Sequence, residues 1–217
     1  TKLFTGPDQY LILLKRVVKI YFLFLFPASI GLACLSKEII LVFGKGLYLQ
    51  AIPVLAVFSM YMLSLGIQNI ISNQILYLYK KEKIDSVLIL LGGILNFILN
   101  ILLIFIGKFT ILTAIITTLI ANLLVIILQY NVVKKILKLD INLFAFENIK
   151  YLFYSISFIP ITMILKNYVF SPIVLCLTDV VLCSLIYLII LLITKDKVLY
   201  HISNKLLCKF KILKRPI

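Results

Sequence analysis

Long apolar stretches alternate with short clusters of charged residues along the whole chain. Each stretch approaches or exceeds the ~20 residues that an α-helix needs to cross the hydrocarbon core of a bilayer. We therefore predict an all-α fold, a polytopic transmembrane helical bundle of six spans. The expected ranges of the spans are Val17–Ser36, Ala51–Tyr79, Ser86–Ile106, Thr110–Tyr130, Tyr151–Leu165 and Pro172–Thr194.

Two of the spans carry a further local signal. The fifth is short and contains Pro160, which removes a backbone donor and interrupts a helix. Only Gly107–Phe109 separate the third span from the fourth, and so short a connection predicts an antiparallel hairpin.

The basic residues test the number of spans, because Lys and Arg gather on the cytoplasmic loops of membrane proteins. Eighteen of the 22 fall at the two termini and on the even-numbered connections. The odd-numbered connections hold the other four, which are Lys37, Lys45, Lys108 and Lys166. We therefore expect a multi-pass protein of the cytoplasmic (inner) membrane with both termini in the cytoplasm.

Composition supports the same class. The chain of 217 residues is 63% hydrophobic and only 14% charged, which leaves too little polar surface for a water-soluble fold. The net charge of +14 does not indicate nucleic acid, because the basic residues lie at the ends of apolar runs and form no continuous patch.

The pattern divides the chain into three parts: a cytoplasmic or interfacial lead-in at 1–16, the six-span bundle at 17–194, and a basic tail at 195–217. Apolar residues recur in the tail at steps of three and four, as in a helix that lies in the headgroup plane. They are Leu199, Ile202, Leu206, Phe210 and Leu213. The first ten residues lack a start methionine and a signal peptide, and we expect the chain to be part of a longer product.

Catalytic chemistry has no signature in this sequence. The four cysteines form no CxxC pair, the single His201 lies in the basic tail, and no glycine-rich phosphate loop is present. We expect no enzyme activity, no metal site and no cofactor. Coupling of transport to an H⁺ or Na⁺ gradient remains an open expectation.

Uncharged polar residues recur at helical spacing in the second, third and fourth spans. They line either a hydrated cavity for a ligand rich in hydroxyl groups or the contacts between helices, and the sequence leaves both interpretations open. The candidate cavity residues are Gln68, Asn69, Asn73, Asn96, Asn100, Thr117 and Asn122.

Two charged residues are further candidates. Asp179 is the only carboxylate well inside an expected span, which makes it a candidate for ion coupling, although Lys166 could approach and neutralise it. Lys19, near the inner end of the first span, is a candidate contact for a diphosphate or a lipid headgroup, or simply extends toward the interface.

Two segments combine small, apolar and polar residues in a distinctive order. The first comprises Pro27, Gly31-Leu32-Ala33, Ile39-Ile40, Phe43-Gly44, Tyr48, Ala51 and Val54-Leu55. The second comprises Gly92-Gly93, Asn96, Asn100, Gly107, Ala114 and Thr117. Both resemble polysaccharide flippases of the multidrug/oligosaccharidyl-lipid/polysaccharide (MOP) exporter superfamily, which transport O-antigen and other lipid-linked oligosaccharides. The resemblance covers about half of the chain and departs from the family where Phe109–Leu112 replace its usual Gly-Ala-Ala.

The resemblance implies the C-terminal part of a MATE/MOP-type transporter. It implies flipping of an undecaprenyl-diphosphate-linked oligosaccharide across the cytoplasmic membrane by alternating access, for surface polysaccharide biosynthesis. The implied partners are membrane lipid, the lipid-linked oligosaccharide and other membrane proteins of polysaccharide assembly, and not nucleic acid. The alternatives are a multidrug or cation antiporter of the same superfamily, a polymerase-type component of polysaccharide assembly, and a membrane protein that transports nothing.

Overall fold

The computed structural model describes residues 7–139 and 142–200, and these residues form helices and short connections with no strand among them. The first six helical segments are α1 (Pro7–Cys34), α2 (Ser36–Gly44), α3 (Ala51–Asn69), the π-helical turn η1 (Ile70–Leu76), α4 (Glu82–Phe105) and α5 (Ile111–Asn131). A second π-helical turn, η2 (Val132–Ile136), precedes α6 (Phe146–Ile156), α7 (Phe158–Tyr168) and α8 (Pro172–Ile193).

Six helical stretches in the described part of the chain are long and apolar enough to cross a membrane, which confirms the predicted number of spans. Their ranges are Gln9–Cys34, Ala51–Leu76, Glu82–Phe105, Ile111–Ile136, Phe146–Tyr168 and Pro172–Ile193. Each helix of 22 residues or more is about 33 Å long or longer, enough for a hydrocarbon core of ~30 Å.

The observed helices run past several expected boundaries. α1 begins at Pro7, ten residues before the expected start of the first span, because proline suits the first turn of a helix and the basic residues that follow are good helix formers. The fifth span is longer than expected, and its helix is interrupted at Ser157 rather than at Pro160, which lies in the first turn of α7.

The predicted hairpin between the third and fourth spans is confirmed. Gly107 takes a left-handed φ of 66°, which glycine adopts without strain, and it lies between the ends of α4 and α5. Thr110 then begins α5 with a capping box: its hydroxyl accepts from the Thr113 amide at 3.1 Å, and the Thr113 hydroxyl accepts from the Thr110 amide at 2.8 Å.

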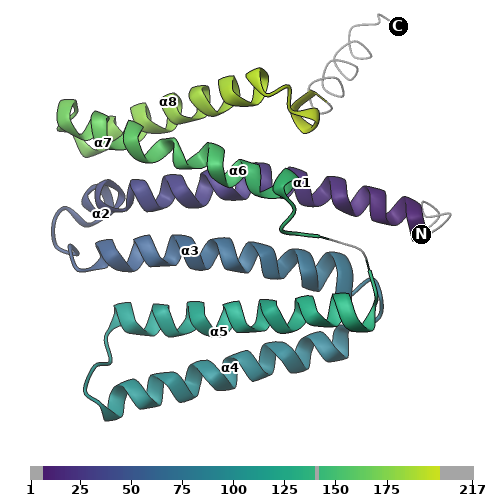
Figure 1. The fold of residues 1–217 in the computed structure, drawn as a ribbon. Helices are drawn as coiled ribbons and strands as arrows, with labels where there is room; N and C mark the ends of the chain where they lie inside the picture. The colour runs from purple at the N-terminus through teal and green to yellow at the C-terminus, as the bar shows by residue number, and fades with distance from the viewer. Residues whose placement is uncertain (1–6, 140–141, 201–217) are drawn as a thin grey trace, which may run out of the picture.

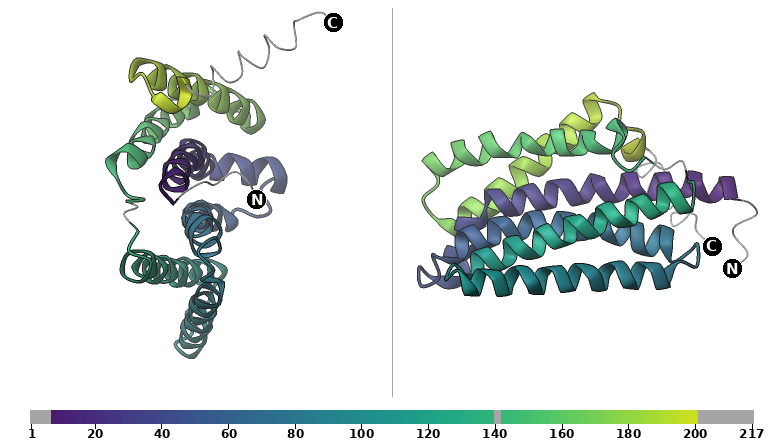
Figure 2. Two further views of the ribbon diagram at one scale, coloured as in Figure 1. Left: turned by 90° about the vertical axis from the view of Figure 1, so that its right-hand side faces the viewer. Right: turned by 60° about the horizontal axis from the view of Figure 1, so that its bottom comes forward.

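The helices lie side by side in one elongated bundle, with α8 at one edge and α4 at the other (Figure 1). Seen end-on, α1 lies between the α6–α8 group and α3, and α5 lies between α3 and α4 (Figure 2). The start of α1, the end of α8 and the α3–α4 and α5–α6 connections share one end of the bundle. The other three connections lie at the opposite end.

The basic residues follow this geometry. The four on the odd-numbered connections, among them Lys108, belong to the end of the bundle that carries the α4–α5 hairpin. The other twelve in the described ranges belong to the end that carries the start of α1. The basic tail falls mainly in residues 201–217, which, like residues 1–6, lie outside the described part.

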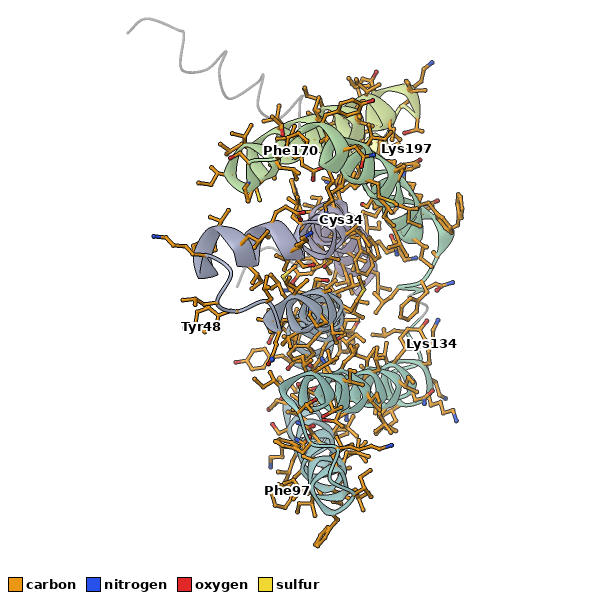
Figure 3. The ribbon with its side chains drawn as sticks, turned by 90° about the vertical axis from the view of Figure 1, so that its left-hand side faces the viewer. Cys34, Tyr48, Phe97, Lys134, Phe170 and Lys197 are labelled. Atoms are coloured by element: carbon orange, nitrogen blue, oxygen red, sulfur yellow. The ribbon has the colours of Figure 1, made fainter. Side chains whose placement is uncertain are left out.

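The outer surface of the bundle is apolar. Phe97 on α4 is 65% exposed and Phe170 before α8 is 90% exposed, and many other large apolar side chains project outward with them (Figure 3). A soluble domain does not expose apolar surface on this scale. The protein is therefore membrane-embedded, with lipid as the solvent of its helices.

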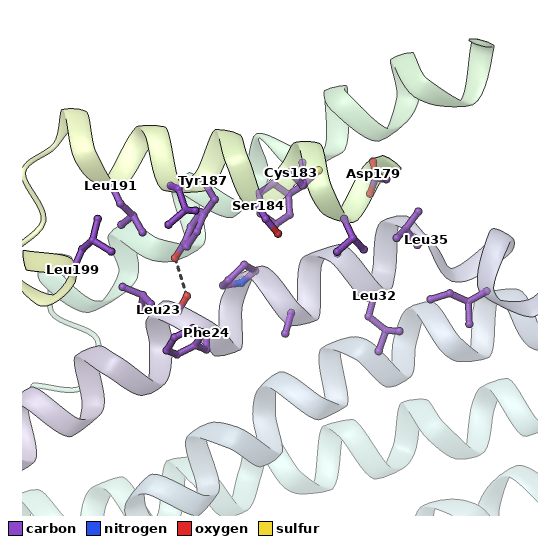
Figure 4. Close-up of a pocket in the computed structure, with 17 residues that line it drawn as sticks. Leu23, Phe24, Leu32, Leu35, Asp179, Cys183, Ser184, Tyr187, Leu191 and Leu199 are labelled. Carbon is purple, nitrogen blue, oxygen red and sulfur yellow. Dashed lines mark hydrogen bonds between the residues drawn. The ribbon is translucent and has the colours of Figure 1, made fainter. Parts of the chain in front are cut away.

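A proline in α1 creates a contact between α1 and α8. Pro27 has no N–H, so the carbonyl of Leu23, four residues earlier, loses its helical partner. The hydroxyl of Tyr187 on α8 donates to this carbonyl at 2.9 Å, and both residues are buried (Figure 4). Because hydrocarbon offers no alternative donor, this hydrogen bond fixes α8 against α1.

Candidate functional site

Close contact between α4 and α5 sets the geometry of the candidate site. Gly92 on α4 faces α5 so closely that a Cβ there would lie 2.3 Å from Cγ2 of Val125, a distance that only glycine permits. The neighbouring Gly93 has open space around its Cβ position. One glycine therefore brings the helices together, and the next leaves room beside them.

The predicted polar residues of α4 and α5 meet across this contact. Asn100 donates to the side-chain oxygen of Asn96 at 3.3 Å, and the Thr117 hydroxyl donates to the side-chain oxygen of Asn100 at 2.7 Å. Asn96 donates in turn to the Thr118 hydroxyl at 3.2 Å. Asn96, Asn100 and Thr117 thus hold α4 against α5, as the interhelical interpretation predicts.

A hollow of about 210 Å³ opens beside these hydrogen bonds, between α3, α4 and α5. Three of the seven predicted cavity residues line it: Gln68 from α3, Asn96 from α4 and Asn122 from α5. Tyr61, Thr118 and the two glycines complete much of its wall. No residue that lines this hollow carries a charge.

Two amide groups at the hollow are not fully used by the protein. Asn122 is buried and donates to the Ser64 hydroxyl at 3.2 Å, but its Oδ1 has no hydrogen-bond partner among the described residues. Gln68 is half-buried, and its side chain likewise makes no hydrogen bond within the described part of the chain. A buried acceptor without a partner is costly in an apolar medium, which favours a donor group in this hollow.

The other predicted cavity residues lie elsewhere. Asn69 and Asn73 are exposed on the side of the second span, where their amides bond to each other at 3.2 Å. Asn100 and Thr117 lie farther along the α4–α5 contact and do not line the hollow. The structure therefore brings together only part of the predicted set.

A second polar cluster, which the sequence analysis missed, lies toward the end of the bundle with the most basic residues. Gln129 on α5 is fully buried and donates to Asp85 at 2.6 Å and to Ser72 at 3.0 Å, and the Ser72 hydroxyl donates to Asp85 at 3.2 Å. Two signals could have revealed it. Gln129 lies seven residues after Asn122, on the same helical face, and Asp85 directly precedes the expected start of the third span.

Asp179 is buried, with 2% of its surface exposed, and accepts a hydrogen bond from Thr162 on α7 at 2.8 Å. Lys166, which the sequence suggested could approach it, forms an ion pair with Glu38 at 3.1 Å and donates to the Cys34 carbonyl at 2.9 Å. Glu38 belongs to α2, where the sequence predicted an outer loop. Asp179 belongs to α8, and α8 lies on the opposite side of α1 from α3, α4 and α5 (Figure 2).

Lys19 forms an ion pair with Glu147 at the start of α6. It also lines two hollows at that end of the bundle. One, of about 280 Å³, is bounded by Lys15, Arg16 and Lys197 as well; the other, of about 250 Å³, includes Asn142, Asn148 and Glu147. Among the described residues, no cluster of three or more His, Cys, Asp or Glu could hold a metal ion.

Comparisons with models of known protein families, with characterised proteins and with solved structures found no match to this chain. The fold itself defines the class of protein: a membrane-embedded, all-helical bundle with six helices able to span a bilayer.

Proposed function

We propose that this protein forms one lobe of a transporter that flips a lipid-linked oligosaccharide across the cytoplasmic membrane, with both termini in the cytoplasm. The observation that carries the proposal is the uncharged polar hollow between α3, α4 and α5, where Gln68 and the carbonyl of Asn122 have unused hydrogen-bonding capacity. The resemblance to polysaccharide flippases of the MOP superfamily supports the same function.

The chemistry of the hollow suits a sugar. A side-chain amide offers both donors and an acceptor, so Gln68 and Asn122 can bind hydroxyl groups in either orientation. No charged side chain lines the hollow, so a neutral sugar that binds there does not strip water from an ion and leave that ion unpaired. These features favour a glycan over a cationic drug.

The size of the hollow indicates that this lobe supplies only one wall of the substrate site. Pockets that enclose a small molecule occupy ~300–1,000 Å³, and this hollow is about 210 Å³. A second helical bundle, facing α3 and α4, would complete the cavity, as alternating access between two bundles requires. In this arrangement the exposed Asn69, at the end of α3, and Asn73, on η1, contribute to the same cavity.

A cation antiporter is the second candidate, and one observation favours it. Asp179 on α8 is buried and accepts a hydrogen bond from the Thr162 hydroxyl. A buried intramembrane carboxylate is a common site for H⁺ or Na⁺. In the flippase, the same residue would couple glycan transport to an ion gradient. Lys19 would contact the diphosphate near the inner rim, in competition with Glu147.

Replacement of the amides that line the hollow or form hydrogen bonds along the α4–α5 contact tests the proposal. Asn96→Leu combined with Asn100→Leu should abolish export of the surface glycan in cells that carry it as their only copy, with normal membrane insertion. Gln68→Leu should slow export about five- to tenfold without loss of stability, because it removes a hydrogen bond to substrate and none within the described protein.

The control is Thr178→Val on α8, whose hydroxyl bonds only to its own helix, far from the hollow. It should leave export unchanged. Normal export by a well-inserted Asn96→Leu/Asn100→Leu protein contradicts the flippase proposal and leaves these amides with a packing role alone.

A further inference from the structure

A long apolar groove runs along α1 on the side away from the polar hollow. It has a volume of about 590 Å³ and lies between α1 and α8, with contributions from α2 and α7 (Figure 4). One wall of the groove runs from Leu23 on α1 to Leu35 just after it, twelve helical steps or about 18 Å, which exceeds the ~15 Å of one bilayer leaflet's hydrocarbon. The lining is mainly apolar, and its polar side chains include Asp179 and Tyr187, which already form hydrogen bonds with Thr162 and with the Leu23 carbonyl. The groove therefore suits a hydrocarbon chain.

A basic hollow lies at the inner end of the same face of α1. It has a volume of about 280 Å³, and its charged lining consists of Lys15, Arg16, Lys19 and Lys197. One of these four, Lys19, is paired with Glu147, and the nearby Asp196 is paired with Lys150. No acidic residue lines the hollow, so its lining carries an excess of positive charge where the headgroups of the inner leaflet lie.

The basic hollow and the apolar groove are neighbours. Ile20 lines the hollow, and Leu23 and Phe24, one helical turn farther along the same face of α1, line the groove. On the opposite wall, Val198 lines the hollow and the next residue, Leu199, lines the groove. The protein thus presents a phosphate-attracting end joined to a channel for a hydrocarbon chain, which is the chemistry of an anionic lipid.

We propose that this combined site binds an anionic phospholipid of the inner leaflet, with its phosphate in the basic hollow and an acyl chain in the groove. The position of the groove favours a lipid that stays bound over transported cargo. α1 and α3 separate the groove from the polar hollow, so an occupant of the groove has no direct path to the proposed glycan site (Figure 2). The inference does not depend on the transport function.

The role of the basic hollow is tested by comparing how tightly the protein binds an anionic and a zwitterionic lipid. Native mass spectrometry of the full 217-residue chain in detergent measures binding of phosphatidylglycerol and of phosphatidylcholine with the same acyl chains. We expect phosphatidylglycerol to bind about tenfold more tightly or better, since several basic residues face its phosphate. Lys15→Gln combined with Lys197→Gln should weaken phosphatidylglycerol binding roughly twenty-five-fold, about fivefold for each charge removed near the membrane surface.

The matched control is Lys80→Gln combined with Lys83→Gln, which removes two charges from the α3–α4 connection and the first turn of α4, at the same end of the bundle. It should leave phosphatidylglycerol binding unchanged. An equal loss in both variants would show general attraction to the basic end and would overturn the proposed site.

The groove is tested separately. Gly31 lines it, and a Cβ at Gly31 would meet nothing within 4 Å, so the side chain of Gly31→Leu enters open space and occupies part of the groove. It should weaken binding of long-chain phosphatidylglycerol at unchanged thermal stability. Binding that is insensitive to Gly31→Leu would overturn the assignment of the acyl chain.

Two competitors identify the source of the phosphate. Millimolar inorganic phosphate should not displace phosphatidylglycerol, because it gains nothing from the groove; displacement would reduce the site to a phosphate site. Undecaprenyl phosphate should compete no better than phosphatidylglycerol. Stronger competition by the polyprenyl lipid would assign the groove to the transported carrier and would overturn the proposal of a resident phospholipid.

Discussion

The hydrogen bond from Tyr187 to the Leu23 carbonyl shows how one residue can decide a helix contact inside a membrane. Pro27 frees the carbonyl, and Tyr187, 164 residues away in sequence, satisfies it. Pro27 and Tyr187 lie on different helices, so the sequence around either residue does not reveal the contact.

Tyr187→Phe should lower the free energy of unfolding in detergent by about 1–2 kcal/mol, because the Leu23 carbonyl loses its partner in an apolar setting. The loss should shrink in a Pro27→Ala background, where residue 27 regains an N–H that can bond to the same carbonyl. A double-mutant cycle measures this coupling.

The control for this cycle is Tyr61→Phe on α3, whose hydroxyl makes no hydrogen bond within the described part of the chain. It should change stability by less than about 0.5 kcal/mol. If Tyr187→Phe lowered the free energy of unfolding equally in the native and Pro27→Ala backgrounds, Tyr187 would not be compensating for the N–H that Pro27 lacks.

Part of the polar site was predictable at this scale, and part was not. The four-residue spacing of Asn96 and Asn100 indicates one helical face, and the structure confirms that they bond to each other and to α5. Glu38 gave no local signal, because its burial depends on Lys166, which lies 128 residues later in the chain. Spacing fixes contacts within a helix but not partners on distant helices.

At the scale of elements, length and hydropathy were sufficient for the six spans but not for α2. Its nine residues begin Ser-Lys-Glu, directly after the first span, and resemble a polar connection. In the structure this segment is helical and packs against α8, with the Lys166–Glu38 ion pair beside the contact. A short helix whose stability comes from tertiary contacts is poorly predicted by local sequence.

The end of α8 is fixed by another such contact. Asp196, 2% exposed, forms an ion pair with Lys150 on α6 and accepts from the Tyr151 hydroxyl at 3.1 Å. It also accepts from the backbone amides of Val198 and Leu199 at 2.9 and 3.2 Å. Burial raises the pKa of Asp196, but these hydrogen bonds and the Lys150 charge outweigh it and hold the pKa below its ordinary value.

Because the folded pKa of Asp196 is depressed, its contribution to stability is present above the unfolded pKa of about 4 and is lost as pH falls through the folded pKa. Asp196→Asn should therefore lower the free energy of unfolding by about 2 kcal/mol near neutral pH. The difference in free energy of unfolding between Asp196→Asn and the native protein should become smaller in acid. Denaturant unfolding of both proteins at neutral and acidic pH measures it.

Glu82→Gln provides the control, because Glu82 is an exposed acid in the first turn of α4. It should cost only about 0.5 kcal/mol. An Asp196→Asn defect that stays the same size down to strongly acidic pH would show that the ionised carboxylate is not what stabilises the end of α8.

At the scale of the whole molecule, the chain has two distinct flanks on either side of α1 and α3. One presents the polar hollow of α3–α5, and the other presents the apolar groove of α1 and α8 with its basic end. Hydropathy predicted the bundle that carries both flanks, because every segment that crosses lipid must be a mainly apolar helix with its backbone hydrogen bonds made internally. It could not predict either hollow, because each is formed by the packing of three or more helices.

Everything at this scale depends on six crossings that place the two ends of the bundle in opposite compartments. Single cysteines at Lys108, Lys81 and Lys195, in a chain whose four native cysteines have been replaced, can be labelled with a membrane-impermeant thiol reagent in intact and in opened cells. The account predicts that Lys108→Cys reacts from the outside, whereas Lys81→Cys and Lys195→Cys react only after the cells are opened. Labelling of Lys108→Cys and Lys81→Cys from the same compartment would contradict it.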